Sequence, residues 1–220
     1  MMEVGDRSSR SVLRRGILGS SDDTRTAPKL ESTAPPGWRA AFADELSDSR
    51  ARLRLARGLA GIGCIHLATF LFCQLIYVAD GRADLRHPLA WFLELVAVLG
   101  FLRMSLGRGW VRSSATVNLV VKLWTTFLIL SFNMVTLNSF TGFDLAWYKP
   151  AWATLSTFLF ASMGWFFNPW LFIPAVQMWA TGLLMVKFPH WAFLIYGVSW
   201  WISLTGLALW IRPGVSARNA

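Results

Sequence analysis

The strongest constraint in this sequence is a series of six long apolar runs. Each run has about the 20 residues that a helix needs to cross a hydrocarbon core of about 30 Å. Short segments containing Gly, Pro, Asn or Asp separate the runs, which is typical of turns. The runs cover residues 59–79, 88–106, 115–137, 150–167, 170–187 and 191–211.

The composition also indicates a membrane protein, because 55% of the 220 residues are hydrophobic and 15% are charged, far from the averages of soluble proteins. In lipid, every backbone polar group must be bonded within the protein, which only helices and closed barrels achieve. Strict alternation of apolar and polar residues is absent, which disfavours a barrel. We therefore predict an all-α integral membrane protein with six transmembrane helices in three hairpins.

Lys and Arg near the ends of the runs predict the orientation, because cytoplasmic loops carry an excess of these residues. With the N-terminus inside, nine of them are cytoplasmic and four are outside. Both termini are therefore predicted to be cytoplasmic, and the high content of Ala, Arg, Leu and Trp is compatible with a bacterial inner (plasma) membrane. The inner set is Arg50, Arg52, Arg54, Arg57, Arg103, Arg108, Arg112, Arg212 and Arg218, and the outer set is Arg82, Arg86, Lys149 and Lys187.

The chain divides into four predicted segments. Residues 1–37 are rich in Ser, Arg, Asp, Thr and Pro and are expected to form a disordered basic cytoplasmic tail. Residues 38–57 are expected to form an amphipathic helix at the membrane interface, because bulky apolar residues recur on one side of it. A six-helix transmembrane domain then covers 58–212, and 213–220 form a second cytoplasmic tail.

The stretch "FFNPWLFIP" predicts a tight turn between the fourth and fifth helices. Pro is well tolerated at the first position of a helix, and the residue before it is pushed out of helical geometry. Asn168 and Pro169 therefore mark the end of one helix and the start of the next. Pro174 lies just beyond the first turn, where it is expected to tilt the new helix slightly.

Ionisable residues inside apolar runs are costly in lipid and usually face the interior of a bundle. The first three runs contain His66, Glu94 and Lys122. On a helical wheel, Lys122 belongs to a polar stripe along the third run, and His66 belongs to the polar side of the first. We expect these polar sides to face each other or a shared interior. The axial gap between Glu94 and Lys122 is one that the Lys side chain can largely cover, so a pair between them is one of the open arrangements. The candidate polar intramembrane site consists of His66, Gln74, Glu94, Asn118, Lys122 and Asn133.

Structural roles are the alternatives to a functional polar site. The Lys122 side chain can extend to the inner headgroups, and Glu94 can be protonated and hydrogen-bonded to a neighbouring helix. Asn and Thr on a helix face join helices in many bundles.

Tryptophan is abundant, with 13 residues in the chain. Those near the ends of the runs are explained by the aromatic belts of membrane interfaces. Trp124, Trp179 and Trp200 lie in the middle of runs and are a candidate apolar pocket for an apolar or aromatic ligand. The alternative is that they only fill volume in the core.

No catalytic motif is present in the sequence, which contains no GxSxG, HExxH, P-loop or glycine-rich dinucleotide fingerprint. Three His and two Cys, with no metal-ligand spacing, predict no cofactor and no metal. Attraction to anionic lipid headgroups and orientation in the membrane explain the net charge of +9, and eleven of the 21 Lys and Arg precede Leu59. No nucleic-acid-binding signature accompanies these residues, so no nucleic-acid partner is predicted.

These observations favour a non-enzymatic membrane protein that acts as a sensor, scaffold or accessory subunit. Its expected partners are the lipid bilayer and another membrane or cytoplasmic protein, and a homo-oligomer is compatible with the sequence. The alternative is a small transporter or channel that uses the polar site of the first three helices.

Overall fold

The computed structural model describes residues 37–80, 86–107, 115–140 and 145–212, without the side chains of residues 115, 138–140 and 145–147. Contacts divide the chain into two units, Met1–Pro35 and Pro36–Ala220. The predicted tails, 1–37 and 213–220, lie almost entirely outside the described residues, as do the basic residues at positions 82, 108, 112 and 218.

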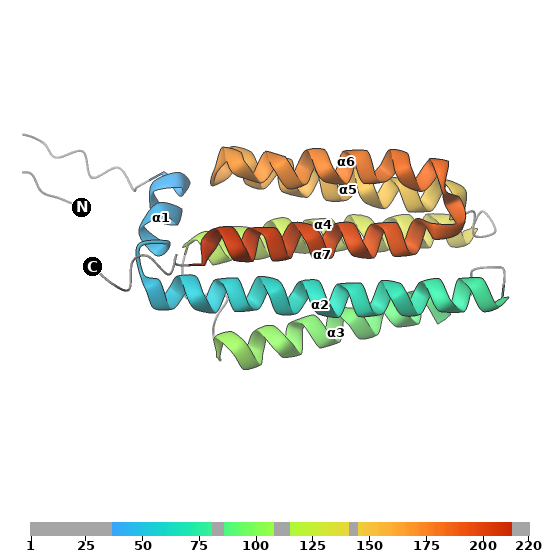
Figure 1. Ribbon diagram of the computed structural model, residues 1–220, viewed down its shortest axis with the longest axis horizontal. Helices are drawn as coiled ribbons and strands as arrows, with labels where there is room; N and C mark the ends of the chain where they lie inside the picture. Colours follow the sequence, from blue (N-terminus) through green and yellow to red (C-terminus); the bar gives the residue numbers. More distant parts are fainter. Residues whose placement is uncertain (1–36, 81–85, 108–114, 141–144, 213–220) are drawn as a thin grey trace, which may run out of the picture. The chain divides into compact units, whose positions relative to one another are not determined.

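Every regular element in the described part of Pro36–Ala220 is helical, which confirms the predicted all-α class (Figure 1). The helices begin and end within a few residues of the six predicted apolar runs, except that α2 starts earlier. In chain order they are α1 (Trp38–Glu45), α2 (Ser49–Asp80), α3 (Arg86–Leu106), α4 (Ala115–Phe140), α5 (Leu145–Phe166), η2 (Pro169–Leu171), α6 (Phe172–Lys187), η3 (Pro189–Trp191) and α7 (Ala192–Ile211).

Among the residues that the structure describes, five helical segments are long and apolar enough to cross a membrane. They correspond to α2, α3, α4, η2 with α6, and η3 with α7. The 22-residue α5 is the sixth predicted span, and it is not one of the five. Its described part begins with Tyr148, Lys149 and Pro150 and contains several Ser and Thr residues, which lower its mean hydropathy.

The segment 38–57 forms two helices in place of the single interfacial helix that was expected. The chain leaves helical geometry after α1, and Asp48 then accepts hydrogen bonds from the backbone N–H groups of Arg50 (2.9 Å) and Ala51 (3.2 Å). A side-chain acceptor at this position is a helix start signal. The Arg-rich stretch therefore belongs to α2, which continues into the first apolar run as one 32-residue helix.

The short helix α1 packs on the protein through Phe42, whose ring lies 5.4 Å from that of Phe167. Phe167 belongs to the turn that the Asn168–Pro169 sequence predicts. Asn168 accepts a hydrogen bond from the Trp170 backbone N–H at 3.0 Å and precedes η2, so the turn is formed as expected.

The helices with the most extensive contact are α2 and α7, which lie side by side (Figure 1). Two glycines allow this approach, because a Cβ atom on Gly197 would lie 2.6 Å from Cβ of Phe70, and one on Gly63 would lie 3.3 Å from Cβ of Leu204. Small residues let helices in lipid pack closely. The start of α2 meets the end of α7, where Arg52 Nε donates to the Ile211 carbonyl at 2.9 Å.

Candidate functional site

His66 on α2 and Glu94 on α3 form a partly buried ionisable pair within the helical unit. Nδ1 of His66 is hydrogen-bonded to Oε1 of Glu94, and the two side chains are 16% and 12% exposed. Ionisable groups in an apolar bundle are stable only when they are paired. The contact therefore explains why both residues can occupy the interior of apolar helices.

Aromatic rings surround His66 on the side of α7. Its ring centroid lies 4.5 Å from that of Phe70, 5.1 Å from that of Trp200 and 5.7 Å from that of Tyr196. Phe70 and Trp152 continue the cluster towards α5, with their ring centroids 5.6 Å apart. The pair is thus held between an aromatic wall and the helix α3.

A cavity of about 140 Å³ lies against this pair. It separates α3 from α4, two consecutive helices that make little direct contact. Most of its wall is apolar, and its floor contains His66 and Glu94. The lining comes from α2 (Ile62, His66, Phe70), α3 (Trp91, Glu94, Leu95, Val98, Leu99, Leu102), α4 (Val121, Trp124, Thr125, Phe127, Leu128, Ser131, Phe132, Val135), α5 (Trp152) and α7 (Tyr196, Trp200).

A second cavity, of about 180 Å³, lies closer to α1. Residues of α1, α2, α3, α4, α5, η2 and α7 line it, and their side chains are almost all apolar. Trp124 and Trp200 contribute to both cavities. The polar residues of this lining are Glu45 and Thr116, and no pair of opposite charges lies among the lining residues.

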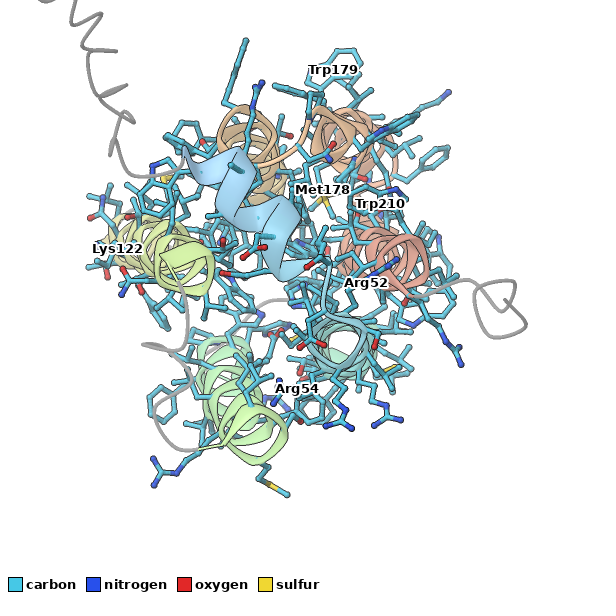
Figure 2. The ribbon with its side chains drawn as sticks, turned by 90° about the vertical axis from the view of Figure 1, so that its left-hand side faces the viewer. Arg52, Arg54, Lys122, Met178, Trp179 and Trp210 are labelled. Atoms are coloured by element: carbon cyan, nitrogen blue, oxygen red, sulfur yellow. The ribbon has the colours of Figure 1, made fainter. Side chains whose placement is uncertain are left out.

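The pair of Glu94 with Lys122 that the sequence left open is not formed, and Glu94 is bonded to His66 instead. Lys122 lies on the exposed side of α4, as Figure 2 shows, and takes part in neither ion pair of the described residues. Asn133 is exposed and Asn118 is partly buried on the same helix. The polar stripe of α4 therefore does not face the polar side of α2.

Gln74 joins helices away from the cavity. It is 3% exposed, donates to the His190 carbonyl at 2.7 Å and accepts a hydrogen bond from the Leu194 backbone N–H at 3.3 Å. These bonds connect α2 to η3 and the start of α7. Gln74 therefore joins helices and does not line the cavity.

Two of the three mid-run tryptophans line the cavities, and the third does not. Trp124 is partly buried, and Trp200 is 4% exposed. Trp179 is 59% exposed on α6 and points outward, whereas its neighbour Met178 points between the helices (Figure 2). Which of these two neighbours points inward depends on the rotation of α6 about its axis. The position of Trp179 in the middle of an apolar run does not predict that rotation.

Trp152 and Ser131 line the cavity but were not among the predicted site residues. Trp152 is near the end of its apolar run, where a belt position is the usual explanation, yet it is 6% exposed. Ser131 is a single small polar residue, 8% exposed, that lies outside the polar stripe of α4. No sequence signal separated these two residues from ordinary packing residues.

A buried lysine lies at the start of α5. The Lys149 ammonium donates to the Pro189 carbonyl at 3.1 Å and lies 4.1 Å from the ring centroid of Tyr77 and 4.6 Å from that of Phe193. Cation–π contacts of this geometry are stabilising. Lys149 therefore connects α5 with α2, η3 and α7.

Within the described residues, no group of three or more His, Cys, Asp or Glu side chains is placed to hold a metal ion. Comparisons with known protein families, with curated proteins and with solved structures find no match to this chain. The class of protein therefore rests on the fold and the cavities, which define an all-helical membrane protein with a partly buried ionisable pair.

Proposed function

We propose that this protein is a non-enzymatic, multi-pass accessory subunit that binds another membrane protein through α4. In this proposal all six long helices span a bacterial inner membrane, and both termini are cytoplasmic. The contact of Arg52 with Ile211 supports an even number of spans, because it joins the start of α2 to the end of α7. Arg50, Arg54 and Arg57 lie at the same end, as expected for a cytoplasmic face.

The observation that carries the proposal is the exposure of the polar stripe of α4. Only 6% of the residues in its most apolar window are buried, although α4 contains Lys122 and Asn133. The hydroxyls of Thr126 and Thr136 bond to the carbonyls one turn earlier, at 3.0 and 2.9 Å, but the two longer side chains have no such partner among the described residues. Lipid offers no hydrogen-bond partners to the Lys122 ammonium and the Asn133 amide. Packing of a second helix with polar side chains against this face therefore lowers the free energy of the protein in the membrane.

We infer that the occupant is a transmembrane helix of another protein with a carboxylate at the depth of Lys122. A carboxylate is the complementary charge for an ammonium group in lipid. A second copy of this chain, related by a two-fold axis normal to the membrane, would place Lys122 beside Lys122. The apolar part of the described helices contains one carboxylate, that of Glu94, and it is already bonded to His66.

Site-specific photocrosslinking in intact membranes tests this proposal. A benzophenone amino acid replaces Ile129, which is 64% exposed on α4, or Ile173, which is 58% exposed on α6. We expect position 129 to yield an adduct with one discrete protein and position 173 to yield lipid adducts alone. Because breaking a desolvated ion pair is strongly unfavourable, Lys122→Met should reduce the adduct by about tenfold or more.

The identity of the adduct decides the outcome. Mass spectrometry should find an Asp or Glu within a membrane helix of the crosslinked protein, and exchanging the two charges, with Lys122→Glu in this chain, should restore the adduct. An adduct of twice the mass of this chain would show a homo-oligomer instead. Equal lipid labelling at positions 129 and 173, or an adduct indifferent to Lys122→Met, would contradict the proposal.

A small transporter or channel is the second candidate, and the partly buried His66–Glu94 pair is the observation that favours it. Such a pair in a bundle often belongs to a proton pathway. Proton flux into reconstituted vesicles, driven by a potassium diffusion potential, tests this function. We expect Glu94→Gln, which removes the carboxylate of the pair, to abolish flux if the protein transports protons, and no flux in the wild type would remove the candidate.

A further inference from the structure

We propose that the cavity between α3 and α4 binds a lipid-soluble molecule with one aromatic ring and a hydrogen-bond acceptor such as a ketone oxygen. The centre of this site lies away from the docking face of α4, because Trp124, Phe127 and Ser131 are on the other side of that helix from Lys122, whereas the lining residue Thr125 borders the docking face. The proposal depends on the size of the cavity, its aromatic wall and its unpaired polar atoms.

The size of the cavity matches one substituted ring. An engineered apolar cavity of about 150 Å³ in another protein stays dry and binds benzene, and the volume here is about 140 Å³. Empty space of this size is costly, because the atoms around it lose packing contacts. A ligand of this volume restores those contacts.

The wall of the cavity favours an aromatic ligand. Four Trp side chains line it, together with Phe70 and Phe127. Aromatic rings attract one another in offset and edge-to-face arrangements beyond the effect of the buried area. Pairs of this kind already occur in the wall, since the ring centroids of Trp91 and Trp152 lie 4.3 Å apart at an angle of 70°.

The polar atoms of the lining favour an acceptor on the ligand. Ser131 and Trp152 are 8% and 6% exposed, and neither Ser131 Oγ nor Trp152 Nε1 has a hydrogen-bond partner within the described residues. The indole N–H can only donate, and the hydroxyl can donate. Nε2 of His66 is also unpaired. A buried donor without a partner destabilises the protein, so a ligand oxygen within reach stabilises both molecules.

The bilayer is the source of the ligand in this proposal. Leu99 on α3 and Phe132 on α4 both line the cavity, and they are 50% and 38% exposed. Thr125 is an exposed lining residue of α4. The edge of the cavity is thus accessible from the sides of two helices that face lipid, and an apolar molecule dissolved in the membrane can enter between them.

Two small molecules of nearly identical shape test the proposal. The first probe is 4-fluoroacetophenone, and the second is 4-fluoro-α-methylstyrene, which has a CH₂ group in place of the ketone oxygen. Binding is measured by ¹⁹F NMR to the full chain in lipid nanodiscs, with empty nanodiscs as the reference for partitioning. We expect saturable binding of both probes, and about fivefold tighter binding of the ketone, because one hydrogen bond distinguishes them.

Variants locate the binding. Val98→Phe on α3 and Ser131→Leu on α4 fill the cavity from two sides, and each should abolish saturable binding. Ser131→Ala and Trp152→Phe should keep binding but reduce the preference for the ketone. Val176→Phe is the control, since Val176 is 62% exposed on α6 and lines neither cavity, so both probes should bind it as they bind the wild type.

Three results would overturn the proposal. Absence of saturable binding beyond empty nanodiscs would remove the site. Unchanged binding in folded Val98→Phe and Ser131→Leu proteins would place it elsewhere. Equal affinity for the two probes in the wild type would contradict the acceptor requirement, even if the filled variants lose binding.

Discussion

The helices α7 and α4 are both apolar enough to cross a membrane, but they are buried to very different extents. In their most apolar windows, 44% of the residues of η3 and α7 are buried, against 6% for α4. The difference does not follow from hydropathy, which is the same for the two segments at 1.6. Apolar composition thus predicts that a helix enters lipid, but not whether it packs at the centre of the protein.

Side-chain size explains much of this difference. The helix α7 places Gly197 against Phe70 of α2, so that the two backbones approach closely and aromatic rings fill the space beside them. The exposed side of α4 contains long or branched polar side chains, which separate backbones. The comparison indicates a stable central pair, α2 with α7, and a peripheral helix with a free face.

Gly197→Val is expected to have the largest effect on stability. A Cβ atom at this position would lie 2.6 Å from Cβ of Phe70, which forces α2 and α7 apart. Overpacking a core lowers the free energy of unfolding by up to about 3 kcal/mol in typical cases, and we expect a loss of about this size here. Equilibrium unfolding in mixed detergent micelles measures the effect.

Gly206→Ala is the matched control on the same helix, because nothing lies within 4 Å of a Cβ atom there. It should leave the unfolding free energy unchanged or raise it slightly, since Ala is a better helix former than Gly. Equal losses for the two variants would show that the close packing of α2 with α7 is not the cause.

Gln74→Leu should have the second largest effect, about 2 kcal/mol of unfolding free energy. The change leaves the His190 carbonyl and the Leu194 N–H without their bonds to the Gln74 side chain. The same unfolding assay measures the loss. Hydrogen exchange should also increase at the start of α7, and unchanged exchange there would contradict the assigned role of Gln74.

Tyr196→Phe should cost about 1 kcal/mol, the net value of one buried hydrogen bond. Its hydroxyl lies 2.7 Å from the Ser156 hydroxyl, and Ser156 also donates to the Trp152 carbonyl at 2.9 Å. Ser156 thus keeps one partner in the variant, which limits the loss. Ser156→Ala should cost a similar amount, and the double variant should cost less than the sum of the two single changes, because they share one bond.

Asn133→Leu should have the smallest effect on the isolated protein, within about 0.5 kcal/mol, because exposed positions contribute little. The same change should weaken the photocrosslink from α4 if a polar partner helix covers this face. A loss comparable to that of Gln74→Leu in the isolated protein would show that α4 is packed as closely as α7, and the comparison would fail.

The helical architecture could be predicted from the sequence, since long apolar runs form helices wherever lipid cannot satisfy the backbone. The turn at Asn168 and Pro169 was also predictable, because Pro restricts the residue before it and Asn accepts from the backbone. Both properties are local, so they depend on the order of residues and not on which helices are neighbours.

The polar site could be predicted only in part. A helical wheel places Lys122, Asn133 and Thr126 on one side of a helix, and that grouping is a property of the sequence. The direction in which this polar side faces is not a property of the sequence alone. It depends on the rotation of α4 about its axis, which is set when Trp124 and Phe127 pack inward. The contact of Glu94 with His66, and not with Lys122, follows from the same rotation.

The sequence alone therefore determined which apolar segments form helices, the turn at Asn168 and Pro169, and which polar residues these helices bring into lipid. Only the tertiary structure decided that α2 and α7 form the central pair, that α3 and α4 are separated by a cavity, and that Ser131 and Trp152 line it. The physical reason is that propensity and hydropathy act within one helix, whereas packing depends on the fit between side chains far apart in the chain.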